Sequence, residues 1–405
     1  MRVAVIGAGV SGLGAAHLLS RAHEVTLFER GRSPGGHVRT IRRRGLALDT
    51  GFLVHNGPNY PLLTRLFTEL GVAVQETEMS FSVSCGDCGL EWSGRRPFAQ
   101  PRRLLDPGFL GMLSDVGRWL RTAGRSLDEA DYEGRTLEEY VTEHRYSRRF
   151  RMHFLVPLTS ALWSTAPERA LDFPASYAIR FFERHGMLGF GRFRWRSIVG
   201  GAETYVTALL QRFDGDVRAG VEVRSLRRGP DGVRVRCADG SESEFDQVVV
   251  ATHADQALRL LEDPSEAERR LLGAWQSTRN EVVLHTDERL LPRAHAARAS
   301  WNYHVNGSVK PSITYYLNRL QRLDADEHWC VTLNRTGEID PERVVDRAVL
   351  EHPLYTTESL STQRGLAELS GERHTYYAGA YLGNGFHEDG LASGVRAAAA
   401  LGVHW

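Results

Sequence analysis

The start of the chain alternates between strand-like and helix-like patterns of apolar and polar residues. Residues 3–6 are apolar without interruption, which is typical of a parallel strand buried on both faces. A glycine-rich turn follows, then a helical pattern over about residues 11–21 and a second strand pattern over residues 24–28. The order of strand, glycine turn, helix and strand predicts a βαβ unit of the dinucleotide-binding type.

Each position of the turn has a physical role in such a unit. Gly7 permits the tight turn, Gly9 lets the backbone approach a pyrophosphate, and Gly12 lets the helix lie close to the strand. Val10 and Ser11 open the helix, whose free N–H groups and positive dipole end would face the phosphates. The same glycine spacing also occurs in ordinary turns, and the strands and helix around it favour the nucleotide interpretation.

The second strand ends at an acid, and a glycine loop follows it. Glu29 lies where a carboxylate binds a ribose 2′-hydroxyl and repels a 2′-phosphate. Arg30 begins a loop that contains several cations and the pair Gly35-Gly36, followed by His37. We expect this loop to hold a second phosphate-rich face of the nucleotide.

Strand and helix patterns also alternate near the middle and the end of the chain. Helices are predicted at 61–70 and 202–212, a strand at 217–226, a hairpin that turns at 239–240, an apolar strand at 248–252 and an alanine-rich helix at the C-terminus. Between them, residues 79–98 resemble a hairpin, 102–196 are mainly helical, and 281–285 and 312–317 are strand-like. The chain therefore combines α/β segments with intervening segments that are mainly helical or hairpin-like.

The helical middle contains two aromatic-rich patterns, each with two interpretations. A stripe at helical spacing, flanked by Arg118, Arg121 and Arg125, either packs on its own domain or rests on lipid headgroups. Its members are Phe109, Met112, Leu113, Val116, Trp119 and Leu120. A second stretch either fills a core or lines an apolar tunnel, and it contains Tyr177, Phe181, Phe182, Phe190, Phe193 and Trp195.

Composition narrows the functional classes. The 405 residues are enough for two domains, and 50 basic and 50 acidic residues cancel, so no overall field favours nucleic acid. No signal peptide or membrane-spanning run is recognisable, and the four cysteines do not form a disulfide framework, which together predict a cytoplasmic protein. Cys85 and Cys88 have a C-x-x-C spacing, but no second Cys or Cys/His pair has metal-ligand spacing. We therefore expect a plain hairpin tip there and no metal site.

Four blocks of the chain together resemble the flavin amine oxidases and phytoene-desaturase-like enzymes. These blocks are the N-terminal fingerprint with Glu29, the Gly35-Gly36 loop, residues 199–252 and residues 378–394. Residues 301–304 and 383–391 are most similar to a bacterial branch of predicted NAD/FAD-binding proteins. The resemblance implies a discontinuous Rossmann-type FAD-binding domain (1–75, 199–270 and 370–405) and a mixed α+β substrate domain (76–198 and 271–369), as in amine oxidases.

The resemblance also implies positions for FAD. Its pyrophosphate would lie at Gly7, Gly9, Ser11 and Gly12, its adenosine ribose at Glu29, its adenine at the backbone of Val223, and its ribityl and pyrimidine edge at Gly379, Asp389, Gly390 and Leu391. His37 stands where these enzymes usually have arginine, and Ala380 replaces the glutamate common in amine oxidases. Because no cysteine lies near the C-terminal block, we expect FAD to be bound without a covalent link.

Hydride transfer to flavin N5 needs a C–H bond held close in a dry pocket, so no catalytic triad is expected. Polar residues that the fold should bring near the flavin or substrate are His55, Tyr303, His304, Tyr315, Asn318 and His387, and each of them has a purely structural alternative. We single out His387 because near-neutral titration suits proton handling. Lys310 is expected in an exposed loop.

The expected reaction is oxidation or desaturation of a lipid or fatty-acyl chain. Amine oxidation and double-bond isomerisation without net redox change are the alternatives. The expected partners are a small-molecule or lipid substrate and a peripheral membrane contact, whereas the oligomeric state is left open.

Overall fold

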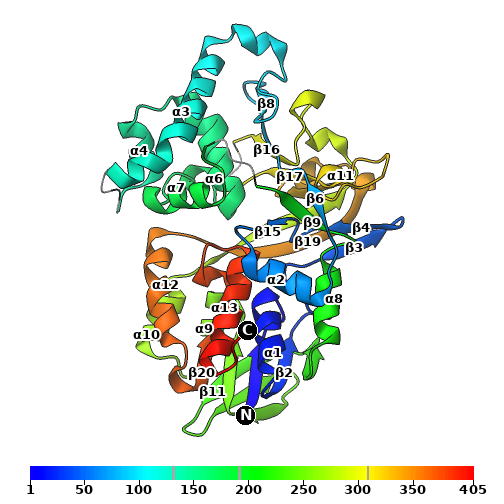
Figure 1. Ribbon diagram of the computed structural model, residues 1–405, viewed down its shortest axis with the longest axis vertical. Helices are drawn as coiled ribbons and strands as arrows, with labels where there is room; N and C mark the ends of the chain where they lie inside the picture. Colours follow the sequence, from blue (N-terminus) through cyan, green and yellow to red (C-terminus); the bar gives the residue numbers. More distant parts are fainter. Residues whose placement is uncertain (130–131, 133, 190–192, 308–309) are drawn as a thin grey trace.

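The computed structural model of the chain describes residues 1–129, 132, 134–189, 193–307 and 310–405. A sheet of five parallel strands forms its lower part in Figure 1, where both termini lie. From edge to edge, the strands are β10 (Asp216–Ala219), β2 (Glu24–Glu29), β1 (Arg2–Ile6), β14 (Gln247–Val250) and β20 (Thr375–Tyr377). This sheet and its helices confirm the predicted α/β class.

Both faces of the central strand β1 are buried, in two different cores. Val3 and Val5 pack with α1 (Val10–Leu19) and α13 (His387–Ala400). Ala4 and Ile6 pack on the opposite side, toward an antiparallel sheet of β11 (Val223–Arg228), β12 (Val233–Cys237) and β13 (Glu242–Phe245). Because successive side chains of a strand point to opposite faces, burial on both sides explains the uninterrupted apolar run.

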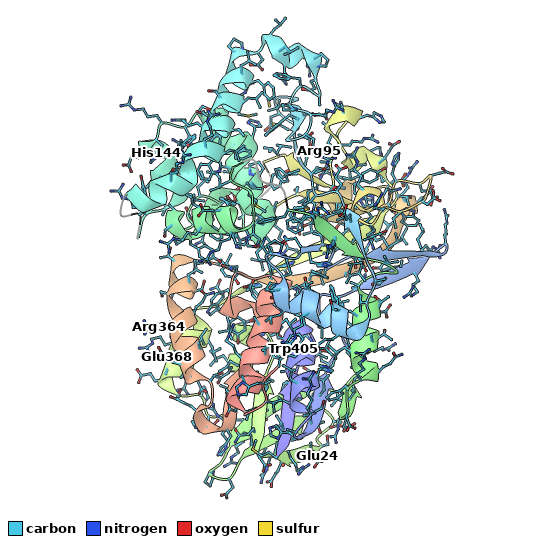
Figure 2. The ribbon with its side chains drawn as sticks, viewed as in Figure 1. Glu24, Arg95, His144, Arg364, Glu368 and Trp405 are labelled. Carbon is cyan, nitrogen blue, oxygen red and sulfur yellow. The ribbon has the colours of Figure 1, made fainter. Side chains whose placement is uncertain are left out.

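The predicted helices at 61–70 and 202–212 are confirmed as α2 (Pro61–Leu70) and α8 (Glu203–Gln211). The single strand expected over 217–226 is wrong, because the chain breaks at Gly220 (φ +76°) and its two halves join different sheets as β10 and β11. Three further helices are α9 (Ala254–Leu260), α10 (Glu266–Gly273) and α12 (Thr357–Leu369). The outer face of α12 carries an exposed ion pair of Arg364 and Glu368 (Figure 2).

The second large sheet has seven strands and lies in the upper part of Figure 1. In order, they are β19 (Val344–Pro353), β15 (Ser277–His285), β18 (Cys330–Leu333), β17 (Ile313–Tyr316), β16 (Trp301–Val305), β7 (Phe81–Cys85) and β8 (Glu91–Ser93). The β7–β8 pairing confirms the predicted hairpin. All seven strands fall within 76–198 and 271–369, and the five parallel strands fall within 1–75, 199–270 and 370–405.

Two small sheets and a short helix complete the architecture around these layers. One sheet pairs β3 (Thr40–Arg43) with β4 (Leu46–Asp49), and the other orders β5 (His55–Asn56), β9 (Trp195–Ile198) and β6 (Val74–Thr77). The short helix is α11 (Leu317–Leu320). Since β5 pairs with β9, His55 is positioned by a strand distant in the sequence.

A helical layer lies beside the seven-stranded sheet, and the apolar stripe of its longest helix is largely buried. The layer contains α3 (Pro107–Glu129), α4 (Leu137–Glu143), α5 (Arg148–Phe150), α6 (Val156–Trp163) and α7 (Ala175–Arg184). Phe109, Met112 and Trp119 of α3 are fully buried, and Trp119 contacts the rings of Tyr140 and Phe182. The stripe therefore packs on its own domain. Phe190 of the second aromatic stretch lies outside the described residues.

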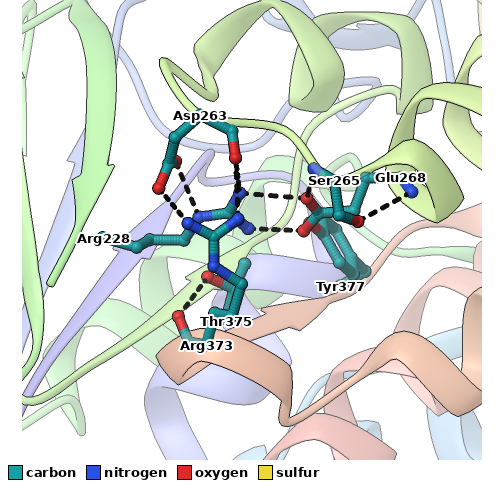
Figure 3. Close-up of polar contacts among 7 residues, drawn as sticks. All are labelled: Arg228, Asp263, Ser265, Glu268, Arg373, Thr375 and Tyr377. Atoms are coloured by element: carbon teal, nitrogen blue, oxygen red, sulfur yellow. Dashed lines mark hydrogen bonds and ion pairs between the residues drawn. The ribbon is translucent and has the colours of Figure 1, made fainter. Parts of the chain in front are cut away.

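A buried ion-pair cluster connects the antiparallel sheet to β20 and α10 (Figure 3). The side chain of Arg228 on β11 is only 1% exposed and donates to Asp263 (Nε to Oδ1, 3.0 Å) and Glu268 (Nη2 to Oε2, 2.9 Å). Burial raises the pKa of Glu268, but hydrogen bonds from Arg228, Tyr377 and Ser265 lower it to about 2. Through Tyr377, the pair ties β20 to the antiparallel sheet. Removing one partner would leave the other charge buried and unpaired, which would lower the free energy of unfolding by about 3–5 kcal/mol.

Candidate flavin site

The predicted nucleotide residues gather where the parallel strands end. Gly7 follows β1 with φ +100°, and a Cβ there would lie 2.7 Å from the carbonyl oxygen of Ala251, which follows β14. Glu29 ends β2, and Gly379 comes shortly after β20. In an open parallel sheet, ligands bind at this carboxyl edge, so the segments are placed as a dinucleotide site requires.

The N-terminus of α1 presents backbone N–H groups without a side-chain cap. Gly9 is its N-cap, and a Cβ at Gly36 would lie 2.8 Å from the Gly9 Cα. The Gly35-Gly36 loop is held against the turn because the Gly35 N–H donates to the Ala8 carbonyl (2.8 Å). Two backbone segments that approach this closely form a cradle that only glycine permits, and the positive end of the helix dipole favours a pyrophosphate there.

Glu29 is oriented by the backbone around it. Its Oε2 accepts the Ala8 N–H (2.9 Å), and its Oε1 accepts the Gly31 N–H (2.7 Å). Each carboxylate oxygen can accept more than one hydrogen bond, so capacity is left for ribose hydroxyls. The Val221 N–H donates to the Glu29 carbonyl (3.0 Å), so Val223, the first residue of β11, lies near Glu29. The Arg30 side chain is exposed.

The first turn of α13 touches the first turn of α1. A Cβ on Gly390 would lie 3.0 Å from the Ser11 Oγ, and one on Gly394 only 2.2 Å from the Ser11 carbonyl oxygen. Leu391 packs against Gly14 of α1, and the Gly379 N–H donates to the Ser393 Oγ (2.8 Å). Two helix N-termini therefore lie at one site, an arrangement that would stabilise negative charge on a bound group.

Asp389 of α13 has a structural task as well as a place at this site. Its Oδ2 accepts the Phe386 N–H (2.9 Å), which caps the helix. Glu388 caps α2 in the same manner by accepting the N–H groups of Leu62 and Leu63. Burial raises the pKa of both carboxyls. These acids are thus bonded to the backbone rather than presented as open anions.

Five histidines lie close enough to affect one another's pKa values, and sequence reasoning found three of them, His37, His55 and His387. His55 is buried, and the other four are partly exposed. The His37 ring lies 6.1 Å from His253 and 5.2 Å from His352, between ring centroids. His387 stacks on Phe52 (4.0 Å), and its Nε2 lies 2.6 Å from the Tyr205 hydroxyl. Sequence reasoning missed His253 and His352. The position of His253 just after the apolar strand β14, at the edge where ligands bind, could have indicated it.

Burial is the main cause that lowers the pKa values of these histidines. Together with neighbouring cations or histidines, it lowers the pKa values of His37 and His55 to about 4 and those of His352 and His387 to about 3. The near-neutral titration expected of His387 is therefore wrong. Among the described residues, the buried His37 Nε2 and His55 Nδ1 have no hydrogen-bond partner, which fits nitrogens that face a bound cofactor.

The other predicted polar residues lie elsewhere. Tyr303 and His304 line a cavity of about 400 Å³ together with apolar side chains such as Met152 and Leu171. His304 contacts the Ser84 Oγ through Nδ1 (2.9 Å), and burial lowers its pKa. This pair is not part of the group around His387.

Tyr315, Asn318 and Lys310 have structural surroundings. The Tyr315 ring packs on Trp301 (5.1 Å between centroids), and the Asn318 side chain bonds only to backbone groups in the hydrogen bonds described. Lys310 lies in an exposed loop, as expected, and its Nζ donates to the Arg279 carbonyl (3.2 Å).

An aromatic wall, defined here as Trp163, Tyr177, Phe181, Tyr355 and Phe386, lies beside the N-terminus of α13. Phe181 stacks on Phe386 (5.1 Å) and contacts Trp163 (4.8 Å), while Tyr177 is nearly parallel to Tyr355 (6.4 Å). Burial raises the pKa of Tyr177 and Tyr355, and the negative charge of nearby Asp389 adds to this effect. Trp163, Phe181 and Tyr355 are buried, and the His185 ring stacks on Phe181 (3.8 Å), so the wall is an aromatic cluster with one histidine beside it.

The fold and this site define an α/β dinucleotide-binding protein. A family model described as flavin containing amine oxidoreductase matches residues 10–402, so the chain belongs to that family and is a flavin-dependent oxidoreductase. Its glycine cradle, the two helix N-termini and the partnerless histidine nitrogens fit such a cofactor. Within the described part of the chain, no helix combines the length and apolar character needed to cross a bilayer.

Individual relatives are similar in different ways. A 52-residue segment is 46% identical to 4,4′-diapophytoene desaturase (4,4′-diaponeurosporene-forming) of Staphylococcus aureus (strain Newman), but it covers only 13% of this chain and 10% of that protein. The fold matches cyclohexylamine oxidase from Brevibacterium oxydans IH-35A and a CLA-producing fatty acid isomerase from P. acnes. In both cases the TM-score is 0.70 with 16% identity, over 99% of this chain and 98% of the other. These structural likenesses show the fold alone.

We predict that the neutral histidines make the protein sensitive to acid. The unfolded chain binds protons on histidine below about pH 6.5, whereas the folded His387 ring stays neutral until about pH 3, so unfolding free energy is lost as the pH falls through this window. His387→Gln should reduce the slope by up to roughly 1.4 kcal/mol per pH unit. Denaturant unfolding between pH 7 and 5 measures this slope.

His404→Gln, at an exposed position near the C-terminus, is the matched control and should leave the slope unchanged. Identical slopes in the wild type and His387→Gln would contradict the assignment of His387 as a neutral buried group.

Proposed function

We propose that this protein is an oxidoreductase with non-covalently bound FAD that oxidises or desaturates a lipid acyl chain. The observation that carries the substrate class is the uncharged aromatic wall beside the N-terminus of α13. FAD supplies a hydride acceptor at N5, and the substrate loses a hydride and a proton from adjacent carbons to form a double bond. Re-oxidation of the bound cofactor would require oxygen or an electron carrier.

The chain's own residues would bind FAD at the cradle already described. The α1 N-terminus and Gly9 hold the pyrophosphate, Glu29 holds the adenosine ribose, and the α13 N-terminus at Gly390 stabilises negative charge on the reduced ring. We assign His37, with its partnerless Nε2, to the same cofactor in place of the arginine usual in related enzymes.

The wall would hold the acyl chain without ionic contacts. Burial of each methylene contributes about 0.8 kcal/mol, so a chain of moderate length is held by its apolar surface. His55 and His387 would take part in proton handling only as neutral imidazoles, because burial lowers their pKa values well below neutrality. Water exclusion by the wall would protect the reduced flavin from side reactions.

Amine oxidation is less well supported by the same site. An amine substrate gains from an open anion or an aromatic cage that binds its cation. The acids of this segment, Glu388 and Asp389, accept backbone N–H groups, and burial raises their pKa values. Within the described aromatic wall, the Tyr177–Tyr355 pair favours an amine, since two facing rings can flank a cation.

We predict that Glu29 is needed for FAD affinity. Glu29→Arg should weaken FAD binding by about tenfold or more, because a hydrogen-bonding carboxylate is replaced by a side chain that cannot accept. Titration calorimetry of the apoprotein measures the affinity, and denaturation should release free flavin. Glu24→Arg, at the other end of β2 (Figure 2), is the control and should bind FAD normally.

Wild-type FAD affinity in a folded Glu29→Arg protein would remove Glu29 from the site. Absence of any FAD binding or thermal stabilisation in the wild type would refute the cofactor assignment itself.

We predict that acyl lipids, and not simple amines, reduce the flavin under anaerobic conditions. Stopped-flow absorbance of the flavin-loaded protein should show bleaching on addition of phospholipid vesicles or free fatty acids, with one double bond formed per flavin. Cyclohexylamine and putrescine serve as amine probes.

Rapid bleaching by an amine with none by lipids would replace the lipid proposal with amine oxidation. Conversion of a lipid double bond while the flavin ends oxidised would identify an isomerase instead.

A peripheral membrane contact would deliver such a substrate, and we propose an apolar tip formed by Phe98, Leu104, Leu105 and Leu110. These side chains are 41–88% exposed and belong to the cyan segment of residues 98–110 at the upper end of the ribbon in Figure 1, which also contains the exposed Arg102. Exposed leucines beside arginine suit insertion at an anionic lipid surface.

Leu104→Ser/Leu105→Ser should lower co-flotation with phosphatidylglycerol vesicles at least severalfold, because the apolar surface that enters the lipid is lost. Val349→Ser, at an exposed apolar position on β19, is the control. Equal flotation of the double variant and the wild type would contradict the contact.

A further inference from the structure

The tip of the β7–β8 hairpin has the backbone of a metal-binding knuckle. Its sequence is Cys85-Gly86-Asp87-Cys88-Gly89, and Gly89 has φ +63°. The Gly89 N–H donates to the Cys85 carbonyl (3.1 Å), which closes the turn. The N–H groups of Asp87 and Cys88 also point at the Cys85 sulfur.

A histidine from another element completes a set of three donor atoms. His153 lies in η2 (Arg151–Leu155), a π-helical turn between α5 and α6, and its Nε2 is 3.5 Å from the Cys88 Sγ. π-helical turns inside helices often occur at functional sites because they redirect a side chain. The Trp92 Nε1–H of β8 donates to the His153 carbonyl (3.2 Å), so the turn is fixed to the hairpin.

The spacing of the donor atoms matches a tetrahedral site. The ligand atoms of Cys85, Cys88 and His153 all lie within 4.8 Å of one another. A tetrahedral zinc ion with Zn–S of about 2.3 Å and Zn–N of about 2.0–2.1 Å separates sulfur from nitrogen by about 3.5 Å and two sulfurs by about 3.8 Å. The Cys88–His153 separation of 3.5 Å is therefore already that of two ligands on one ion, and the other two separations are at most 4.8 Å.

Neighbouring side chains hold the knuckle from outside. Arg103 Nη2 donates to the Cys88 carbonyl (3.0 Å), and Gln100 Nε2 donates to the Gly89 carbonyl (3.0 Å). Both bonds use main-chain oxygens and leave the sulfur atoms free to face His153. The donor set thus combines a hairpin, a π-helical turn and a supporting segment into one preformed arrangement, which lowers the ordering cost of binding an ion.

We propose that Cys85, Cys88 and His153 bind one Zn²⁺ ion, with solvent in the fourth position. Two thiolates and one imidazole form a soft donor set that suits zinc, and a three-residue set leaves one coordination position open. Binding displaces the thiol protons and crosslinks the seven-stranded sheet to the helical layer. The site does not involve the flavin residues, so it stands independently of the proposed function.

Zinc and flavin content of the full-length, flavin-loaded protein, measured on the same dialysed sample, test this proposal. We expect one Zn²⁺ per chain, and a Co²⁺-substituted sample should show thiolate-to-cobalt charge-transfer absorption. Cys88→Ser and His153→Ala should each lower Zn²⁺ affinity at least tenfold while flavin content stays normal. Cys237→Ser and His404→Ala, outside the cluster, are the matched controls and should keep the ion.

Three results would overturn the proposal. The first is a reduced protein that holds less than a tenth of an equivalent of Zn²⁺ and shows no cobalt–thiolate absorption. The second is unchanged affinity in both variants. The third is a Cys85–Cys88 disulfide, seen by mass spectrometry before and after reduction, in a protein that binds no metal in either state. If a variant loses its flavin and unfolds, the wild-type cobalt spectrum still decides the outcome.

Discussion

The close approach of α1 and α13 is the constraint on which the rest of the structure depends. Gly394 lies so near the Ser11 carbonyl that any Cβ would collide with it, and Gly390 and Gly14 allow the same contact along the helix pair. Because glycines let the helices approach closely, the N-terminal and C-terminal segments of the chain bring two helix N-termini to one place. The parallel sheet brings Glu29 to the same edge.

This packing also sets the electrostatic character of the site. Charge for an anionic cofactor comes from helix dipoles and backbone N–H groups, and these need no buried cation. The histidines around His387 are held neutral by burial, and Asp389 is bonded to the backbone. A region with these properties can exclude water and accept an apolar substrate without leaving buried charges unpaired. In the proposed function, flavin binding and lipid specificity both depend on the close packing of α1 and α13.

Much of the nucleotide half was predictable because its signals are local. The apolar run of β1, the glycines that follow it and the acid at the end of β2 encode strand, turn and charge within a short stretch. The strand expected over 217–226 was wrong because one glycine with φ +76° sends its halves into two sheets. Tyr303 and His304 were expected near the flavin or the substrate, and the structure places them at a cavity that does not include His387.

The sequence by itself determined the βαβ unit, the positions where glycine is required, and the family resemblance, since periodicity and backbone conformation are encoded by neighbouring residues. Only the tertiary structure decided which distant side chains meet. It joined His253 and His352 to His37, buried the apolar stripe of α3, and brought His153 to Cys85 and Cys88. These contacts depend on long-range packing of sheets and helices, and no local pattern specifies the distance between residues that lie far apart in the chain.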